Sequence, residues 1–335
     1  MKILTGALIF LVLLSGIAFA QEVVVGDLPG SWTYPFKRFA ETLDLAFTFD
    51  NVAKAEKYAN YAQLRLLEAH ALLAQNKSEF VPDVMKEYTV QVREAARIAN
   101  MNDTHALQVS EKVATKLKDN FQLLDEIETA TESQDMENVV TSAKDETLNR
   151  SLMLAEKFAE QKPVDAAQFA VAIAETRVER IQAMIQKNKT DLVPVEAERY
   201  QRAIAVGMNI SEIAKAHHEN ATSVAEIVAA ATSTHLAVLS EVYDKVPEVA
   251  KPHIAWAMNA SKTGNDIAVD VICGEMSPNE TRANCLAEIN KTNKSFVPPE
   301  AILTRVNEIL PPPQIQPVPH EETKEGASTK VESKR

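Results

Sequence analysis

The sequence predicts an all-α protein, an elongated helical bundle made of two tandem three-helix-type repeats. Three observations lead to this prediction. No glycine occurs between Gly30 and Gly207, and only five prolines occur between residues 37 and 253. The residues that form the tight turns of β-hairpins are therefore scarce. Apolar residues recur at alternating spacings of three and four, which indicates one buried helix face of coiled-coil type. The block NKSEFVP at 76–82 returns as NKTDLVP at 188–194.

The repeat extends over consecutive predicted helices. The seam of the first helix consists of Val52, Ala55, Ala59, Ala62, Leu66, Ala69 and Leu73, and 112 residues later it becomes Val164, Ala167, Val171, Ala174, Val178, Ile181 and Ile185. In the second helix Val84, Tyr88, Val92 and Ala95 match Glu196, Tyr200, Ile204 and Gly207. A third helix, 109–127, resembles 224–242 after a small change of register. The NK(S/T) stretch is the expected turn between the first two helices, with a proline in the first turn that follows it.

These patterns divide the chain into five segments. Residues 1–20 read as a secretory signal peptide, because a short apolar run ends in Ala18-Phe19-Ala20; the alternative is an uncleaved membrane anchor. We expect the first repeat unit at 21–151, the second at 152–265, a helical extension at 266–310 and a disordered Pro-rich, charged tail at 311–335. No transmembrane segment is expected after signal cleavage, and the predicted location is the cell envelope or the exterior.

The net charge limits the kinds of partner, and the two cysteines predict a disulfide. Removing residues 1–20 takes away one lysine and leaves 34 basic against 47 acidic residues, a net charge of −13. Such a surface opposes binding to nucleic acid. Cys273 and Cys285, the two cysteines, flank a Ser-Pro-Asn turn signal, and in an exported chain they predict a local disulfide.

Two blocks of the chain resemble a known family. LPGSWTYPFKRFAETLDLAFTFD and the helix after it (28–75) resemble the opening of the extracytoplasmic domain of unknown function 5667, in which a Tyr-x-x-Lys start precedes an Arg-x-x-Glu helix. Tyr34 and Lys37 match the start, and Arg65 and Glu68 match the helix. Residues 235–265 resemble the family's closing segment, and the repeat predicts two tandem copies. The resemblance implies an exported, all-helical protein of archaeal type and supplies no catalytic residue.

Ten of the 18 asparagines begin an N-x-(S/T) triplet, whereas the Ser and Thr content predicts about two. This excess favours N-glycosylation. The alternative is that asparagine serves turns and caps, which suits Asn76 and Asn188 but explains Asn209 and Asn220 poorly. The ten are Asn76, Asn102, Asn149, Asn188, Asn209, Asn220, Asn259, Asn279, Asn290 and Asn293.

Few residues suggest chemistry. Arg65 with Tyr88, and Arg177 with Tyr200, recur on apolar patterns and are candidates for a ligand site between helices. The alternative is that each arginine head pairs with the Tyr hydroxyl or with a neighbouring carboxylate, Glu68 for Arg65 and Glu175 or Glu179 for Arg177. His217 and His218 point about 100° apart on a helix and cannot share one metal, and His235 reads as structural.

No nucleophile motif or phosphate-binding glycine loop occurs, so the sequence predicts no catalysis, cofactor or metal. We expect a helical glycoprotein that acts as a spacer or protein-interaction module with a protein partner in the cell envelope. The alternative is a small-ligand-binding protein with its site near the two Arg-Tyr pairs.

Overall fold

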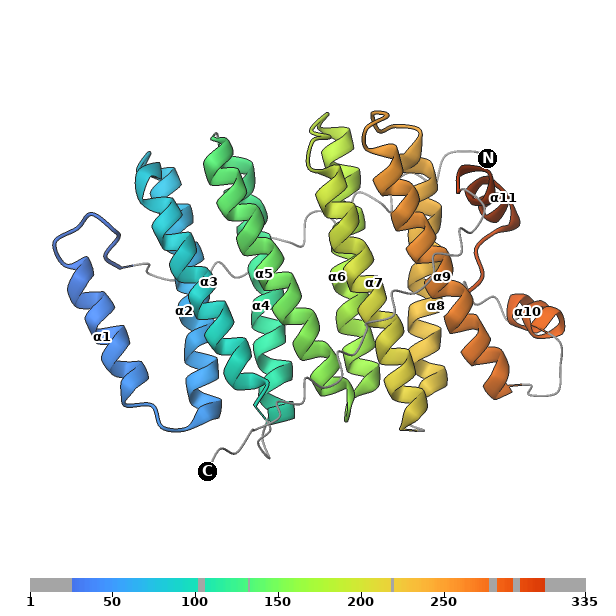
Figure 1. The fold of residues 1–335 in the computed structure, drawn as a ribbon, viewed down its shortest axis with the longest axis horizontal. Coiled ribbons are helices and arrows are strands. Elements are labelled where there is room, and N and C mark those ends of the chain that lie inside the picture. The colour runs from blue at the N-terminus through green and yellow to red at the C-terminus, as the bar shows by residue number, and fades with distance from the viewer. Residues whose placement is uncertain are drawn as a thin grey trace, which may run out of the picture.

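The computed structural model describes residues 26–101, 106–131, 133–217, 220–276, 282–291 and 296–310, and within them it contains α-helices and one short 3-10 helix but no strand (Figure 1). The predicted signal peptide and tail, His218, Asn102, Asn279 and Asn293 lie outside the described residues. The helices are α1 Tyr34–Ala46, α2 Asn51–Ala74, α3 Val81–Ala99, α4 Ala106–Ala130, α5 Gln134–Ala159, α6 Pro163–Gln186, α7 Val193–Ala216, α8 Ala221–Tyr243, α9 Lys251–Met276, α10 Arg282–Lys291 and α11 Glu300–Ile309.

The helices form two layers. The hairpins α2–α3, α4–α5, α6–α7 and α8–α9 stand side by side, so that α3, α5, α7 and α9 make one continuous layer (Figure 1). In the other layer α2 packs on α4 and α6 packs on α8, whereas α4 and α6 barely touch. The second layer is therefore interrupted at the junction of the two repeat units.

Each repeat unit contains four helices, one more than the expected three. The first unit is α2–α5 and the second is α6–α9, with α2 and α6 offset by 112 residues at both ends. The offset grows to 117 at the start of α5 and α9, because the connections between later helices differ in length. The predicted unit boundaries at 151/152 and 265/266 consequently fall inside α5 and α9.

Most positions of the predicted seams are buried, and the others are partly buried. Ala55, Ala59 and Ala62 in α2, and Ala167 and Ala174 in α6, have no exposed surface. Small side chains at these positions permit close packing of the neighbouring helices at the 8–10 Å distance typical of helix pairs. One described helix, α8, is long and apolar enough to span a membrane by composition, but half of its apolar window is buried against the rest of the fold.

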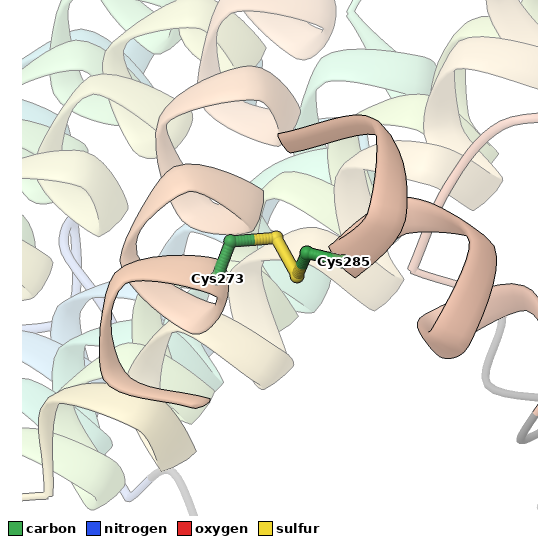
Figure 2. Close-up of a disulfide and its surroundings, with 2 residues drawn as sticks. All are labelled: Cys273 and Cys285. Carbon is green, nitrogen blue, oxygen red and sulfur yellow. A yellow bond between two sulfur atoms is a disulfide. The ribbon is translucent and has the colours of Figure 1, made fainter. Parts of the chain in front are cut away.

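The C-terminal end carries the predicted disulfide (Figure 2). Cys273 in α9 is bonded to Cys285 in α10, with their Cα atoms 5.7 Å apart. Both cysteines belong to a small apolar cluster, which also includes Ile272 of α9. The bond therefore fixes α10 to the end of the helical stack, as the sequence predicted.

The N-terminal loop shows why Gly30 is required. This residue has a φ of +89°, and a Cβ there would lie 3.1 Å from the ring of Phe80, which follows the first NK(S/T) turn. The loop is thereby held against the α2–α3 connection, and α1 begins directly after it.

Candidate functional site

The four residues that carry the family resemblance meet in one buried cluster. Tyr34 and Lys37 of α1 face Arg65 and Glu68 of α2. The Tyr34 hydroxyl donates to Glu68 Oε2 at 3.1 Å and accepts from Arg65 Nη1 at 3.2 Å, while Lys37 Nζ lies 2.6 Å from Glu68 Oε1. Arg65 Nη2 pairs with Glu41 Oε1 at 2.7 Å and with Glu68 Oε1 at 3.0 Å. We call these five residues, Glu41 included, the α1 cluster.

The centre of the α1 cluster is closed to solvent. Arg65 and Glu68 have no exposed side-chain surface, and Glu41 is nearly buried. Burial raises the pKa of the Tyr34 hydroxyl to about 12, so this hydroxyl stays protonated and remains a donor to Glu68. Arg65 Nε is buried without a hydrogen-bond partner among the described residues, whereas both Nη atoms of Arg65 are paired. The positive and negative charges of the cluster balance, and their contacts hold α1 in place.

The remaining charged residues of α1 also face its neighbours. Arg38 pairs with Glu41 and with Glu87 of α3. Asp44 accepts hydrogen bonds from Lys57 Nζ at 2.5 Å and from the Tyr61 hydroxyl at 2.7 Å, both on α2. Every charged side chain of α1 is thus engaged with another charged or polar group.

The opposite face of α1 is apolar and exposed. Exposed apolar residues also flank this helix on both sides. We call the whole set the aromatic ridge: Phe36, Phe39 and Leu43 of α1, with Trp32 before the helix and Phe47 and Phe49 after it, whose exposed fractions run from 39 to 86%. An amphipathic helix normally turns its apolar stripe toward the core and its charges toward water. Helix α1 does the reverse, and the ion pairs and hydrogen bonds of its polar face fix this orientation.

A second buried ionic cluster joins the two repeat units. It takes two residues from each of four helices: Asp125 and Glu128 (α4), Lys144 and Asp145 (α5), Arg177 and Arg180 (α6), and Glu196 and Arg199 (α7). We call it the junction cluster. It lies where α4 and α6 barely touch, so charged side chains connect the layer at this point.

Glu196 is the centre of the junction cluster. Its side chain has no exposed surface and lies 2.9 Å from Lys144 Nζ, 2.7 Å from Arg199 Nη1 and 3.2 Å from Arg177 Nη1. Burial alone raises the pKa of a carboxyl, but the nearby charges of Lys144, Arg177, Arg199 and Arg180 outweigh it and hold the pKa of Glu196 well below its usual range.

Three carboxylates in this cluster are close enough to share a cation. Oxygens of Asp125, Glu128 and Glu196 lie within 4.8 Å of one another. The ammonium of Lys144 already occupies their centre, at 2.7, 3.0 and 2.9 Å from the three. Because a protein cation neutralises the group, its geometry does not indicate a metal site.

A cleft lies beside the junction cluster, between α4 and α6. Its volume is about 920 Å³, and Phe121, Asp125, Arg177 and Arg180 are among its lining residues. The guanidinium of Arg177 stacks over the Phe121 ring, 4.6 Å from its centroid. Nε and Nη2 of Arg177 are buried and have no hydrogen-bond partner among the described residues. This cleft is the part of the described chain that best fits the predicted ligand site.

The predicted Arg-Tyr pairs do not form. Arg65 bonds Tyr34 and not Tyr88, whose hydroxyl lies 2.5 Å from Thr147 Oγ1 of α5. The hydroxyl of Tyr200 correspondingly lies 2.5 Å from Ser261 Oγ of α9. The two buried tyrosines thus repeat one structural contact between adjacent helices of the continuous layer.

The predicted ion-pair partners are right for one arginine and wrong for the other. Arg65 pairs with Glu68, as the i, i+3 spacing indicated. Glu175 and Glu179 are exposed, whereas Arg177 turns inward and pairs with Glu196.

Six of the sequon asparagines are exposed. Asn76, Asn149, Asn188, Asn209, Asn220 and Asn259 are all exposed, and Asn290 lies in α10. The expectation that turn geometry explains Asn220 poorly is wrong, because this residue has a φ of 54° immediately before α8. Asn76 and Asn188 share this left-handed conformation, which asparagine tolerates well.

The histidines carry no metal geometry among the described residues. His235 is buried next to Tyr200, and burial lowers its pKa to about 4, so the ring is neutral at physiological pH. His217 ends α7 on the surface. Both positions agree with structural roles.

Comparison with known proteins supports the fold and one family. A search of curated proteins found no match. A circular tandem repeat protein with novel repeat topology and enhanced subunit contact surfaces aligns over 78% of this chain with 17% identity and a TM-score of 0.51, and this chain spans 58% of that protein's length. A de novo designed helical repeat protein aligns over 76% of this chain and 98% of its own, with 18% identity and a TM-score of 0.29.

The family match coincides with a structural unit. The model of the domain of unknown function DUF5667 matches residues 26–161, which begin before α1 and end just after α5. That range contains the whole α1 cluster and the first four-helix unit. The α1–α5 part of this chain is therefore similar to the DUF5667 family of domains of unknown function.

Proposed function

We propose that this protein is an exported helical-repeat spacer and protein-interaction module without catalytic activity, which docks to its partner in the cell envelope through the aromatic ridge of α1. The observation that carries the proposal is the reversed orientation of α1, whose charges are buried against α2 and α3 while its aromatic side chains face outward. Exposing such a patch is unfavourable unless a partner covers it.

The energetic cost of this orientation supports a docking role. Each large apolar side chain left in water forgoes about 1.5–3 kcal/mol of burial energy. The buried Arg65 and Glu68 also require desolvation that only their mutual contacts offset. A helix that served only to cap the stack would be more stable in the opposite orientation, with a polar outer face.

The positions of three sequons support an exported molecule in which glycans cover one layer of helices. Asn149 lies in α5, Asn209 in α7 and Asn259 in α9, and all three are exposed. Glycans attached to them would cover the continuous layer and leave α1 free. Intact mass of the protein isolated from its native host tests export and glycosylation together. Added glycan on a chain that begins at Gln21 is the expected result.

The docking role is tested by capture from the native envelope. The purified mature chain, its Phe36→Glu/Phe39→Glu variant and a Trp256→Glu variant are each incubated with detergent-solubilised envelope. Trp256 is a matched control, because it is an exposed aromatic on α9. Partner recovery should be lost for the double variant alone. Equal recovery by all three chains would contradict docking through the ridge.

The cleft between α4 and α6 favours a second function, binding of a small ligand with an anionic group. The support is the cleft volume of about 920 Å³ beside the buried Arg177, whose Nε and Nη2 have no hydrogen-bond partner among the described residues, although Nη2 lies 4.0 Å from Asp125 Oδ2. Native mass spectrometry of the protein from its own host tests this function: a bound mass that disappears on denaturation is expected, and its absence would contradict the proposal.

A further inference from the structure

The aromatic ridge has the spacing of a helix-pairing seam. Within α1 and at its C-cap, ridge positions 36, 39, 43 and 47 follow steps of three, four and four, close to the alternation that places side chains along one narrow stripe. Trp32 precedes the helix, and its ring contacts that of Phe36 with centroids 6.3 Å apart. A narrow stripe suits one facing helix. A helix that lies in a membrane interface instead presents a broad apolar half.

The size of the ridge matches one side of a protein interface. At about 200 Å² for each aromatic side chain, five aromatics with exposed fractions of 62 to 86% present roughly 700 Å². This exceeds the largest apolar patch of a typical monomer, about 300–600 Å². It approaches the roughly 800 Å² that each partner contributes to a stable complex of standard size.

The exposed side of α1 carries no charge. Its exposed positions are Pro35, Phe36, Phe39, Ala40, Thr42, Leu43 and Ala46, while Lys37, Arg38, Glu41 and Asp44 point toward α2 and α3. A membrane-surface helix usually adds lysines and arginines that face anionic lipid, and none is available here. A second copy of α1 that packs on this side would meet no like charge and would bury no charged side chain.

The small residues between the aromatics favour pairing with an identical helix. Ala40 and Ala46 interrupt the row of phenylalanines, and alternation of large and small side chains allows two copies of one stripe to interdigitate. An antiparallel pair related by a two-fold axis places the same patch on both sides, and such an interface closes without leaving a free surface.

We propose that the aromatic ridge is a homodimerisation surface, through which two copies of this chain join at α1 in a two-fold symmetric pair with their repeat units pointing apart. The proposal rests on the function proposed above, in that it names a second copy as the partner that covers the ridge. The chain would then become a symmetric rod about twice as long, with α10 and α11 at its two tips (Figure 1).

Sedimentation velocity of the full mature chain, measured at protein concentrations from about 0.1 to 100 μM, tests the proposal. The expected result is a dimer that dissociates on dilution. Phe36→Glu/Phe39→Glu should be a monomer at every concentration with an unchanged far-ultraviolet circular dichroism spectrum. Trp256→Glu should behave like the wild type, because its exposed aromatic lies outside the ridge.

Three outcomes would overturn the homodimer. A wild-type monomer at 100 μM would do so directly. A dimer that persists in the Phe36→Glu/Phe39→Glu variant would place the interface elsewhere. A monomer that binds phosphatidylcholine–phosphatidylglycerol vesicles only with the ridge intact would make it a membrane surface. If the chain is a monomer and envelope capture still depends on the ridge, docking stands and the second copy alone is excluded.

Discussion

Replacing Lys144 with methionine gives the sharpest test of the junction cluster. Methionine keeps most of the side chain's length and removes one buried positive charge. Asp125, Glu128 and Glu196 lose a contact of 2.7–3.0 Å, and two of these carboxylates are at least 97% buried. Breaking a buried ion pair by removing one partner costs about 3–5 kcal/mol, because the charge left behind is uncompensated.

Thermal unfolding followed by circular dichroism measures this cost. At about 2–4 °C for each kcal/mol in a domain of comparable size, the midpoint should fall by about 6–20 °C. Because the cluster joins the units, the transition should also broaden or separate into two, since repeat arrays lose cooperativity when a junction weakens. Lys112→Met is the control: its pair with Glu56 is largely exposed, and its loss should cost no more than about 1 kcal/mol.

The pH dependence gives an independent check. Glu196 has a pKa held below its usual range in the folded protein, so its contribution to stability is present above about pH 4.5 and is lost as the pH falls through the lower folded value. In Lys144→Met the carboxylates repel one another, and protonation relieves that repulsion. The stability gap between the two proteins should therefore narrow below pH 4.5. A midpoint equal to that of Lys112→Met, or a gap that widens in acid, would refute the role assigned to Lys144.

Three further results are expected. Arg65→Met should speed hydrogen exchange in α1 by at least tenfold while α6–α9 keep their protection, since the α1 cluster loses its central cation. An exchange rate in α1 equal to that of the wild type would contradict the role of the α1 cluster in holding this helix. His235 has a pKa lowered to about 4, so the free energy of unfolding should fall by up to about 3 kcal/mol between pH 6.5 and 4, and His235→Gln should remove that slope in denaturant titrations. The Cys273→Ser/Cys285→Ser variant should lose protection in α10, consistent with about 3 kcal/mol from closing its loop, while the α2–α5 core is unaffected in the same exchange experiment.

The sequence predicted the seams well because they depend on local spacing. Ala59 and Leu66, and their counterparts Val171 and Val178, follow helical periodicity, which needs no knowledge of the neighbouring helices. The fourth helix of each unit escaped detection, because α5 and α9 are offset by 117 residues and no longer align with the 112-residue shift. The repeat of this fourth helix was hidden by the different lengths of the connections, because α5 and α9 are themselves both helical.

The ionic clusters were harder to predict, because they assemble residues from several helices. Arg65 and Arg177 were identified as unusual, but Lys144 and Glu128 look like ordinary residues of a solvated helix face. One signal was available: Glu196 occupies the position that Val84 holds in the first repeat. A charge in place of a core valine predicts a buried counter-charge.

The orientation of α1 runs against periodicity altogether. Phe36, Phe39 and Leu43 form the stripe that an amphipathic helix would bury. The structure turns this stripe outward, because Arg65 and Glu68 on α2 match the charges on the other side of α1. Only the contacts of the folded chain reveal which side of such a helix faces the protein.

The interrupted layer at α4 and α6 has a mechanical consequence. Elsewhere the stack resists bending through two layers of packed helices, whereas at the junction one layer transmits load through charged side chains across a cleft. A bending force on the molecule therefore concentrates its deformation at this place. Because the groups that separate there are charged, water can solvate them as they part. A spacer with such a junction can bend reversibly between its two repeat units while each unit keeps its own structure.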